Sequence, residues 1–573
     1  MLAAADVHVA RALGRLGGED DERVLLAVAL TVRGLRLGHV LVGLDGIASA
    51  VAVDAQEPVS LEALRWPDPV DWIPRVASSG LVATGPRSDG PRPLRLDGSS
   101  LYLDRCFEQE TRVARALRSL IERPVGGVDE RLLDEGIARL FGPGSDDLQA
   151  LAARAAVRER LSVVAGGPGT GKTTTIARIV ALVCEQPRAA GEPAPLVALT
   201  APTGRAAARL EEAVHAEAAQ LDVAPELRSQ LLSMRAQTLH RLLGLRPGGG
   251  GQRPERRLAH DLVVVDETSM VSLSLMASLT GSLRPATRLV LVGDPDQLTS
   301  IEAGSVLADI VGSGERPGIV ALERVHRFGG GIAALAAAIR AGDGDRVMEI
   351  LRSPPGEVTW LPGGAAAGEP PPEVLSRALA AAADTSAAAR AGSAAQALER
   401  LARFRVLCAH RHGPYGAETW SAMIEARVRH GGDAGGGSSA TWYAGRPLLA
   451  VENDPELGLS NGDTGVVVEL GGGRVGCAFA RGGGIVLHSP SRLGQVHTVY
   501  ASTIHRSQGS QFDRAAVLLP EQGSPLLTRE LLYTAVTRAR RELLVAGEED
   551  SIRRAVSRPA ARASGLRARL RDA

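Results

Sequence analysis

Lysine is nearly absent from this 573-residue chain: Lys172 is the only one among 65 basic residues, and all the others are arginines. A compact ammonium group fits between phosphate oxygens, whereas a broad planar guanidinium group does not. Lysine was therefore retained at the one position where its shape matters. This absence makes Lys172 a candidate phosphate ligand.

Long apolar runs and closely spaced cysteines are also missing. The apolar run Val24–Val32 is far shorter than the ~20 residues that span a bilayer. Four acidic residues precede it where a signal peptide needs basic ones, which predicts a cytoplasmic protein with no membrane partner. The scattered cysteines favour buried thiols over a zinc or iron–sulfur site; they are Cys106, Cys184, Cys408 and Cys477.

The net charge is zero, so any binding of nucleic acid must rely on local basic stripes rather than on a global field. The length predicts three or four domains. The basic tail Ser551–Ala573 is expected to be a solvated helix face, with a DNA or partner contact as the alternative.

Around Lys172 the sequence matches the phosphate-binding pattern G-x-x-x-x-G-K-[ST]. The apolar run Leu161–Ala165 precedes the glycines, and apolar residues at helical spacing follow them, which predicts strand, loop and helix in that order. Lys172 would bridge the β- and γ-phosphates of a nucleotide, and the Thr173 hydroxyl would hold Mg²⁺. The predicted nucleotide-binding residues are Gly166, Gly167, Pro168, Gly169, Thr170, Gly171, Lys172, Thr173 and Thr174.

Three further apolar runs, Leu196–Leu199, Leu262–Val265 and Leu289–Val292, each end in polar residues. Short buried strands that alternate with helices predict a parallel sheet with its function at the carboxyl ends of the strands. Asp266 would then coordinate Mg²⁺ through water, and Glu267 would act as the general base in nucleotide hydrolysis.

Beyond residue 445 the pattern changes to short strands separated by glycine turns, which predicts a small β-barrel inserted into a second α/β domain. The predicted architecture is α/β, with two parallel-sheet domains, a helical N-terminal domain and a small β-barrel. The expected division is 1–115 for the N-terminal domain, 128–316 for motor domain 1, 317–444 with 498–573 for motor domain 2, and 445–497 for the insertion.

The motifs occur in an ordered series that resembles the superfamily 1 DNA helicases. The series is Gly166–Thr173, Ala201–Arg205, Gln237–Leu243, Asp266–Met270, Gly293–Gln297, Arg327, Thr503–Phe512 and Tyr533–Arg540. Within that group, Tyr533–Arg540 and Gly293–Leu298 with Glu302–Gly304 resemble the RecD-type alpha subunit of exodeoxyribonuclease V. Leu101–Arg105 and Trp442–Pro447 resemble the partner-binding domain and the β-barrel of the same family.

The resemblance implies two RecA-like parallel-sheet domains and an SH3-like β-barrel. It also implies an ATP-driven motor that moves 5′ to 3′ along single-stranded DNA from DNA ends, with beta and gamma subunits as partners. It implies that Gln149 reads the adenine, that Gln297 senses the γ-phosphate, and that Arg327 and Arg538 reach the nucleotide from the second domain. It also implies a set of residues facing DNA, namely Thr203, Arg205, His240, Asn461, Thr503 and His505. Phosphate contacts of this kind grip a strand without regard to its sequence.

Two positions depart from the family, which more often has Lys at Arg506 and Glu at Gln511. The only lysine is already committed to the phosphate loop, so we expect the nuclease centre of the complex to lie on a partner subunit. A freestanding 5′-to-3′ helicase is the alternative function, and a structural subunit with a decayed ATPase is a second one.

Overall fold

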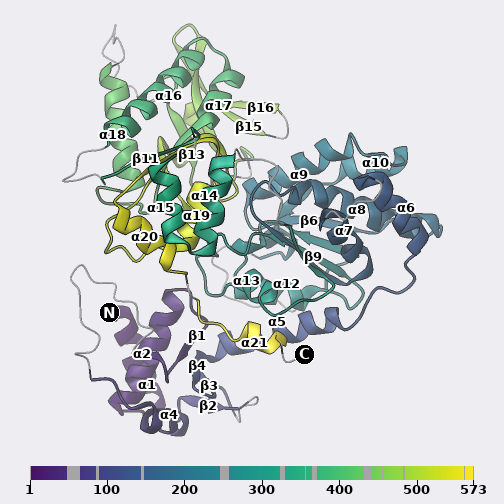
Figure 1. Cartoon of the computed structure of the whole chain (residues 1–573), viewed down its shortest axis with the longest axis vertical. Helices are drawn as coiled ribbons and strands as arrows, with labels where there is room; N and C mark the ends of the chain where they lie inside the picture. The colour runs from purple at the N-terminus through teal and green to yellow at the C-terminus, as the bar shows by residue number, and fades with distance from the viewer. Residues whose placement is uncertain are drawn as a thin grey trace.

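The computed structural model describes residues 2–47, 65–85, 90–142, 148–245, 257–322, 330–354, 356–363, 371–431, 441–454, 456–481, 484–560 and 562–571. The elements form four groups: an N-terminal group, two parallel-sheet domains and an antiparallel insertion. The end of the chain returns to the N-terminal group, where the chain began (Figure 1). Among the described helices, none combines the length and the apolar character that a membrane span requires.

The N-terminal group packs helices on a small sheet. The helices are α1 (Ala4–Gly17), α2 (Glu22–Arg36) and α4 (Pro69–Ser78). The sheet has the order β1-β4-β3-β2, with β1 (Leu41–Gly43), β2 (Val82–Thr84), β3 (Leu94–Asp97) and β4 (Ser100–Leu103). The predicted helices are confirmed, but the sheet was not predicted, because strands of three or four residues are too short to show a period.

Motor domain 1 is built on a six-stranded parallel sheet with the order β10-β5-β9-β8-β6-β7. Its strands are β5 (Leu161–Gly166), β6 (Val197–Ala201), β7 (Ala236–Thr238), β8 (Leu262–Val265), β9 (Arg288–Gly293) and β10 (Ile319–Leu322). The helices around it are α5 (Asp104–Ile121), α6 (Glu130–Phe141), α7 (Leu148–Arg158), α8 (Lys172–Ala189), α9 (Gly204–Ala218), α10 (Pro225–Ser233), α11 (Leu239–Leu242), α12 (Leu273–Ser282) and α13 (Val306–Val311).

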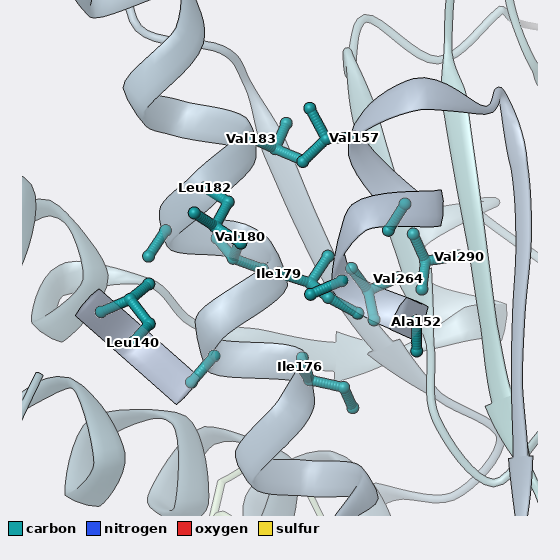
Figure 2. Packing of buried hydrophobic residues seen from close by; sticks show 14 of the residues in the cluster. Leu140, Ala152, Val157, Ile176, Ile179, Val180, Leu182, Val183, Val264 and Val290 are labelled. Atoms are coloured by element: carbon teal, nitrogen blue, oxygen red, sulfur yellow. The ribbon is translucent and has the colours of Figure 1, made fainter. Parts of the chain in front are cut away.

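Apolar side chains fix α8 against this sheet. Ile176, Ile179 and Val180 of α8 are fully buried and belong to one cluster with Val264 of β8 and Val290 of β9 (Figure 2). Burial of each such side chain contributes roughly 1.5–3 kcal/mol relative to exposure. The cluster thus holds the first turn of α8, which carries the phosphate loop, in a fixed place.

Motor domain 2 has a five-stranded parallel sheet with the order β11-β20-β19-β12-β18. Its strands are β11 (Val358–Leu361), β12 (Phe404–Cys408), β18 (Ala501–Thr503), β19 (Phe512–Leu518) and β20 (Ala539–Ala546). Its helices are α14 (Gly330–Ala341), α15 (Gly344–Arg352), α16 (Pro372–Arg390), α17 (Ala394–Arg403), α18 (Ala417–Gly431), α19 (Arg529–Val536) and α20 (Glu549–Ser557). Both predicted parallel sheets are therefore present.

The insertion is an antiparallel sheet of five strands in the order β16-β15-β14-β13-β17. The strands are β13 (Pro447–Ala450), β14 (Thr464–Gly471), β15 (Arg474–Arg481), β16 (Gly484–His488) and β17 (Val496–Thr498). An antiparallel insertion is confirmed. Among the described residues no ladder joins β16 to β17, so closure into a barrel stays a prediction.

The C-terminal tail leaves motor domain 2 and ends beside the N-terminal group, where α21 (Leu566–Arg571) lies close to α5 (Figure 1). Leu566 and Leu570 are buried in the apolar cluster beneath α5. Arg569 forms ion pairs with Glu110, at 3.1 Å, and with Asp97, at 2.7 Å. The expectation of a solvated helix face holds for Arg554, Arg567 and Arg571, which are exposed, whereas Arg569 and the apolar side of the tail pack within the molecule.

Candidate nucleotide and DNA site

The phosphate loop joins β5 to α8 as predicted. Every residue of β5 is buried, and α8 begins at Lys172. Gly169 and Gly171 have φ angles of 87° and 84°, which side-chain-bearing residues rarely adopt. A Cβ atom on Gly171 would lie 2.4 Å from Nε2 of Gln149. Glycine is thus required here by both the backbone and the close approach of Gln149.

Lys172 turns its ammonium group back over the loop. Nζ donates to the carbonyl oxygens of Gly166, at 2.5 Å, and of Gly167, at 2.8 Å. Its charge opposes the rise in pKa that burial causes at Asp266 and Asp294. Lys172 therefore lies against the backbone of the phosphate loop, at the carboxyl end of β5.

Gln149, in α7, donates from Nε2 to the carbonyl oxygen of Thr170 at 3.0 Å. This bond fixes the glutamine side chain to the phosphate loop. Of the other predicted loop residues, Pro168 and Thr170 are buried, whereas Thr173 and Thr174 are partly exposed in the first turn of α8. All of the predicted nucleotide-binding residues therefore lie together.

Two acidic residues follow β8 at the carboxyl edge of the sheet. Burial, aided by Glu267, raises the pKa of Asp266 above its usual range, and Lys172 opposes this rise. Glu267 has φ 50° and is the only described residue other than glycine with a positive φ angle. Such backbone strain is typical of functional positions. At this positive φ angle the backbone leaves the extended direction of β8, and it does so at the residue expected to be the general base.

Asp294 follows β9 and was not assigned a role from the sequence. It is 1% exposed, and burial raises its pKa. Its Oδ2 atom accepts a hydrogen bond from Nε2 of Gln297 at 2.9 Å. A carboxylate directly after a buried strand was the available signal, the same one that identified Asp266.

Motor domain 2 contributes Arg538, which lies one residue before β20 and is 2% exposed. Its guanidinium group donates to the carbonyl oxygens of Thr534, at 3.0 Å, and of Ser510, at 3.1 Å. Burial lowers the pKa of Arg538, and the charges of Glu267 and Asp294 counteract this effect. The charge of this arginine in the second domain and the carboxylates of the first are therefore close enough to act on one another.

A second residue that the sequence did not single out is Tyr533 of α19. Its hydroxyl donates to Oδ2 of Asp294 at 3.1 Å across the interface between the two sheets. Arg327, the other predicted arginine, lies outside the described residues. The described part of the site thus unites Lys172, Asp266, Glu267, Asp294, Gln297, Tyr533 and Arg538.

The residues predicted to face DNA lie on separate elements. Thr203 caps α9 and accepts from the backbone N–H of Ala206 at 3.2 Å. His240 is exposed in α11, and Asn461 is exposed in a turn of the insertion. Thr503, the last residue of β18, accepts from the backbone N–H of Arg506 at 3.3 Å.

Arg205 and His505 are the other two residues predicted to face DNA, and burial lowers the pKa of each. For Arg205, Asp463 of the insertion opposes this effect, and for His505, Arg562 adds to it. A Cβ atom on Gly204, the neighbour of Arg205, would lie 2.6 Å from the hydroxyl of Ser460. The insertion therefore packs directly on the start of α9.

Three family models match separate parts of the chain. An AAA domain matches residues 145–360, and a UvrD-like helicase C-terminal domain matches residues 498–546. The N-terminal domain of the RecBCD enzyme subunit RecD matches residues 1–102. These matches follow the same order as the groups of elements in the structure.

Relatives extend this likeness over the full chain. The RecBCD enzyme subunit RecD of Mycobacterium tuberculosis (strain ATCC 25618 / H37Rv) is 47% identical, covering 100% of this chain and 95% of the relative. The same subunit of Mycolicibacterium smegmatis is 46% identical, covering 100% and 98%. The ATP-dependent RecD2 DNA helicase of Deinococcus radiodurans is 29% identical, covering 82% of this chain and 58% of the helicase.

Among solved structures, the Pif1 helicase from Candida albicans covers 71% of this chain and 96% of its own, with 14% identity and a TM-score of 0.40. This likeness is too low to support any functional assignment. The assignment depends on the full-length relatives. By that identity the chain belongs to the family of the RecBCD enzyme subunit RecD, an ATP-dependent helicase subunit.

Proposed function

We propose that this chain is an ATP-dependent 5′-to-3′ single-strand DNA translocase and helicase. It acts as a motor subunit of the exodeoxyribonuclease V complex with RecB- and RecC-type subunits, the beta and gamma subunits, in repair of double-strand breaks by homologous recombination. The observation that carries this proposal is the hydrogen bond from Tyr533 of motor domain 2 to Asp294 of motor domain 1, at 3.1 Å, directly beside Gly167 of the phosphate loop. A nucleotide site shared between two domains can convert hydrolysis into relative movement.

The residues fit ATP with Mg²⁺. Lys172 would hold the terminal phosphates, while Thr173 and, through water, Asp266 would hold the metal ion, which supplies charge neutralisation when bound. The glycine loop supports this fit, because without side chains its backbone N–H groups can approach a phosphate closely. The loop also leads into the N-terminus of α8, which favours an anion. Gln149 would contact the adenine, Glu267 would take the proton of the attacking water, and Arg538, with Arg327, would stabilise the charge that develops.

DNA would run over the residues Thr203, Arg205, His240, Asn461, Thr503 and His505. The contact between the insertion and the start of α9 supports a path that passes beneath the insertion. The proposal includes the domain boundaries expected from the sequence and an SH3-like barrel for the insertion. It also includes a cytoplasmic location, where the protein would meet broken DNA ends. The nuclease centre would lie on a partner subunit.

The deciding experiment measures ATP hydrolysis by the full chain with and without single-stranded DNA. The Lys172→Gln variant should lose the DNA-stimulated rate while its melting temperature stays unchanged, because the loop keeps its glycines. An unchanged rate in this variant would refute the motor function. Translocation assays on strands labelled at one end then test the polarity.

Co-purification separates this function from the alternatives. The higher identity and the fuller coverage of the RecD subunits, compared with RecD2, support a subunit of a complex over a freestanding helicase. The intact set Lys172, Asp266, Glu267 and Arg538 supports an active ATPase over a decayed one. Purification without large partner subunits from the native cell would favour the freestanding helicase.

A further inference from the structure

The hydroxyl of Tyr533 makes a contact that links the two motor domains at the nucleotide site. Tyr533 is 4% exposed, and its hydroxyl donates to Oδ2 of Asp294 at 3.1 Å. The same oxygen accepts Nε2 of Gln297 at 2.9 Å, and the other oxygen, Oδ1, accepts the backbone N–H of Asp296 at 3.1 Å. Asp294 is therefore a buried carboxylate with three donors, one of which comes from the other domain.

The neighbours of Tyr533 show that this contact belongs to a closely packed interface. A Cβ atom on Gly167 of the phosphate loop would lie 2.8 Å from the tyrosine oxygen. Thr534 accepts from the backbone N–H of Leu298 at 2.9 Å, and Gln508 donates to the carbonyl oxygen of Leu298 at 2.6 Å. The side chain of Leu298 is buried in the apolar cluster of motor domain 2. Closure of the domains therefore brings the tyrosine to a defined place.

The amide of Gln297 shows what this contact can do. Its nitrogen is committed to Asp294, and its oxygen, buried in a side chain that is 3% exposed, has no hydrogen-bond partner among the described residues. Because the carboxylate fixes which end of the amide faces it, the free end is the oxygen, an acceptor. An acceptor of this kind can orient a water molecule, but it cannot bond to an unprotonated phosphate oxygen, so the γ-phosphate sensing expected of Gln297 would pass through that water.

We propose that Tyr533 is a positioning residue: on closure of the motor domains its hydroxyl holds Asp294, and Asp294 fixes the Gln297 amide so that its oxygen orients the attacking water. This inference rests on the proposed ATPase function. It makes the hydrolysis rate depend on closure, because opening removes one of the donors that hold Asp294. A buried carboxylate that loses a donor reorganises towards another partner, and the ammonium group of Lys172, whose charge acts on Asp294, is a candidate.

Two properties of the site support the role of the hydroxyl rather than of the ring. Burial, together with Asp294 and Asp296, raises the pKa of Tyr533, so the hydroxyl keeps its proton and can donate. The ring is surrounded by the apolar cluster of motor domain 2, which phenylalanine would fill equally well. Removal of the oxygen alone therefore tests the bond without opening a cavity.

The test compares Tyr533→Phe with Tyr102→Phe in the full chain. Tyr102 is a matched control, because it is 2% exposed and its hydroxyl donates to a buried carboxylate, Glu110, at 3.2 Å, far from the nucleotide site. Loss of a hydrogen bond to a charged group predicts a kcat for DNA-stimulated hydrolysis lower by about tenfold in Tyr533→Phe. KM for ATP should stay within about twofold, since the phosphate loop is unaltered. Tyr102→Phe should leave both values unchanged.

A double-mutant cycle tests whether the effect passes through Gln297. In a Gln297→Ala background, Tyr533→Phe should change kcat by less than about twofold, because the group that it positions is gone. A full tenfold loss in that background, or a Tyr533→Phe rate equal to wild type, would overturn the inference. Its failure is distinct from failure of the proposed function, in which the wild-type chain itself shows no DNA-stimulated hydrolysis that depends on Lys172.

Discussion

The two parallel sheets hold their functional residues at opposite edges. In motor domain 1, Lys172, Asp266 and Asp294 follow the carboxyl ends of β5, β8 and β9. In motor domain 2, Arg538 precedes the amino end of β20, and its guanidinium group donates to Ser510, just before the amino end of β19. The carboxyl ends of the strands in motor domain 1 thus form the anion-binding site typical of α/β folds. Motor domain 2 supplies the guanidinium group of Arg538 and the hydroxyl of Tyr533 to that site.

The difference lies in what each edge can attract. Parallel strands followed by helices direct backbone N–H groups and helix N-termini towards the carboxyl edge, which favours phosphate. In motor domain 2, the helix α19 ends just before Arg538, and no strand of its sheet is followed by the G-x-x-x-x-G-K-[ST] pattern, because Lys172 is the only lysine in the sequence. The second sheet is therefore a support for residues that act on the site of the first, and the following substitutions test this division.

The largest effect is expected from Arg538→Ala. An arginine that neutralises developing charge in phosphoryl transfer contributes about 10³-fold or more to kcat. We expect a loss of that size in DNA-stimulated ATP hydrolysis, while a nonhydrolysable ATP analogue still binds within about fivefold of wild type. Stopped-flow hydrolysis and equilibrium titration measure the two quantities.

Arg540→Ala is the matched control for this substitution. Arg540 lies two positions further along and is exposed, and it donates to Gln511 at 3.1 Å. Its removal should change kcat by no more than about threefold. Should Arg538→Ala retain more than a tenth of the wild-type rate at an unchanged melting temperature, motor domain 2 would not complete the site of motor domain 1.

An intermediate effect is expected from Gly171→Ala, which alters only the edge of motor domain 1. The φ angle of 84° costs alanine about 1–2 kcal/mol, and the new Cβ atom would meet Nε2 of Gln149 at 2.4 Å. The loop must shift, so we expect the affinity for ATP to fall about tenfold or more. Titration with a fluorescent nucleotide measures this change.

Gly191→Ala provides the control at the other end of α8. Gly191 has a φ angle of 72°, and a Cβ atom there would meet no other group within 4 Å. Both variants should lose similar stability in thermal melts, but Gly191→Ala should bind nucleotide like wild type. Equal affinities in the two variants would mean that the geometry of Gly171 has no part in nucleotide binding.

The smallest effect is expected from Gln511→Glu, which restores the residue that the family more often has. The change replaces the hydrogen bond to Arg540 with an ion pair that is open to solvent, worth about 0.2–1 kcal/mol. DNA-stimulated hydrolysis should therefore change by less than about threefold. A tenfold increase would show that the carboxylate has a functional role in motor domain 2.

Local patterns in the sequence sufficed for the elements on which the site is built. The strands β5, β6, β8 and β9 were all predicted within two residues of their ends, and the loop before α8 was predicted in its place. Continuous apolar runs and glycines at fixed spacing produce these elements almost independently of the rest of the chain. The N-terminal sheet and the packing of the tail were not predicted, because neither produces a periodic spacing of apolar residues in the sequence.

The sequence by itself determined that Lys172, Asp266 and Glu267 share one edge, because parallel strands must bring their carboxyl ends together. Only the tertiary structure decided that Tyr533 meets Asp294, 239 positions away, that Arg538 is buried, and that Leu566 packs beneath α5. Such contacts depend on how whole domains pack. That packing is the sum of many weak apolar contacts, and no single stretch of sequence encodes it.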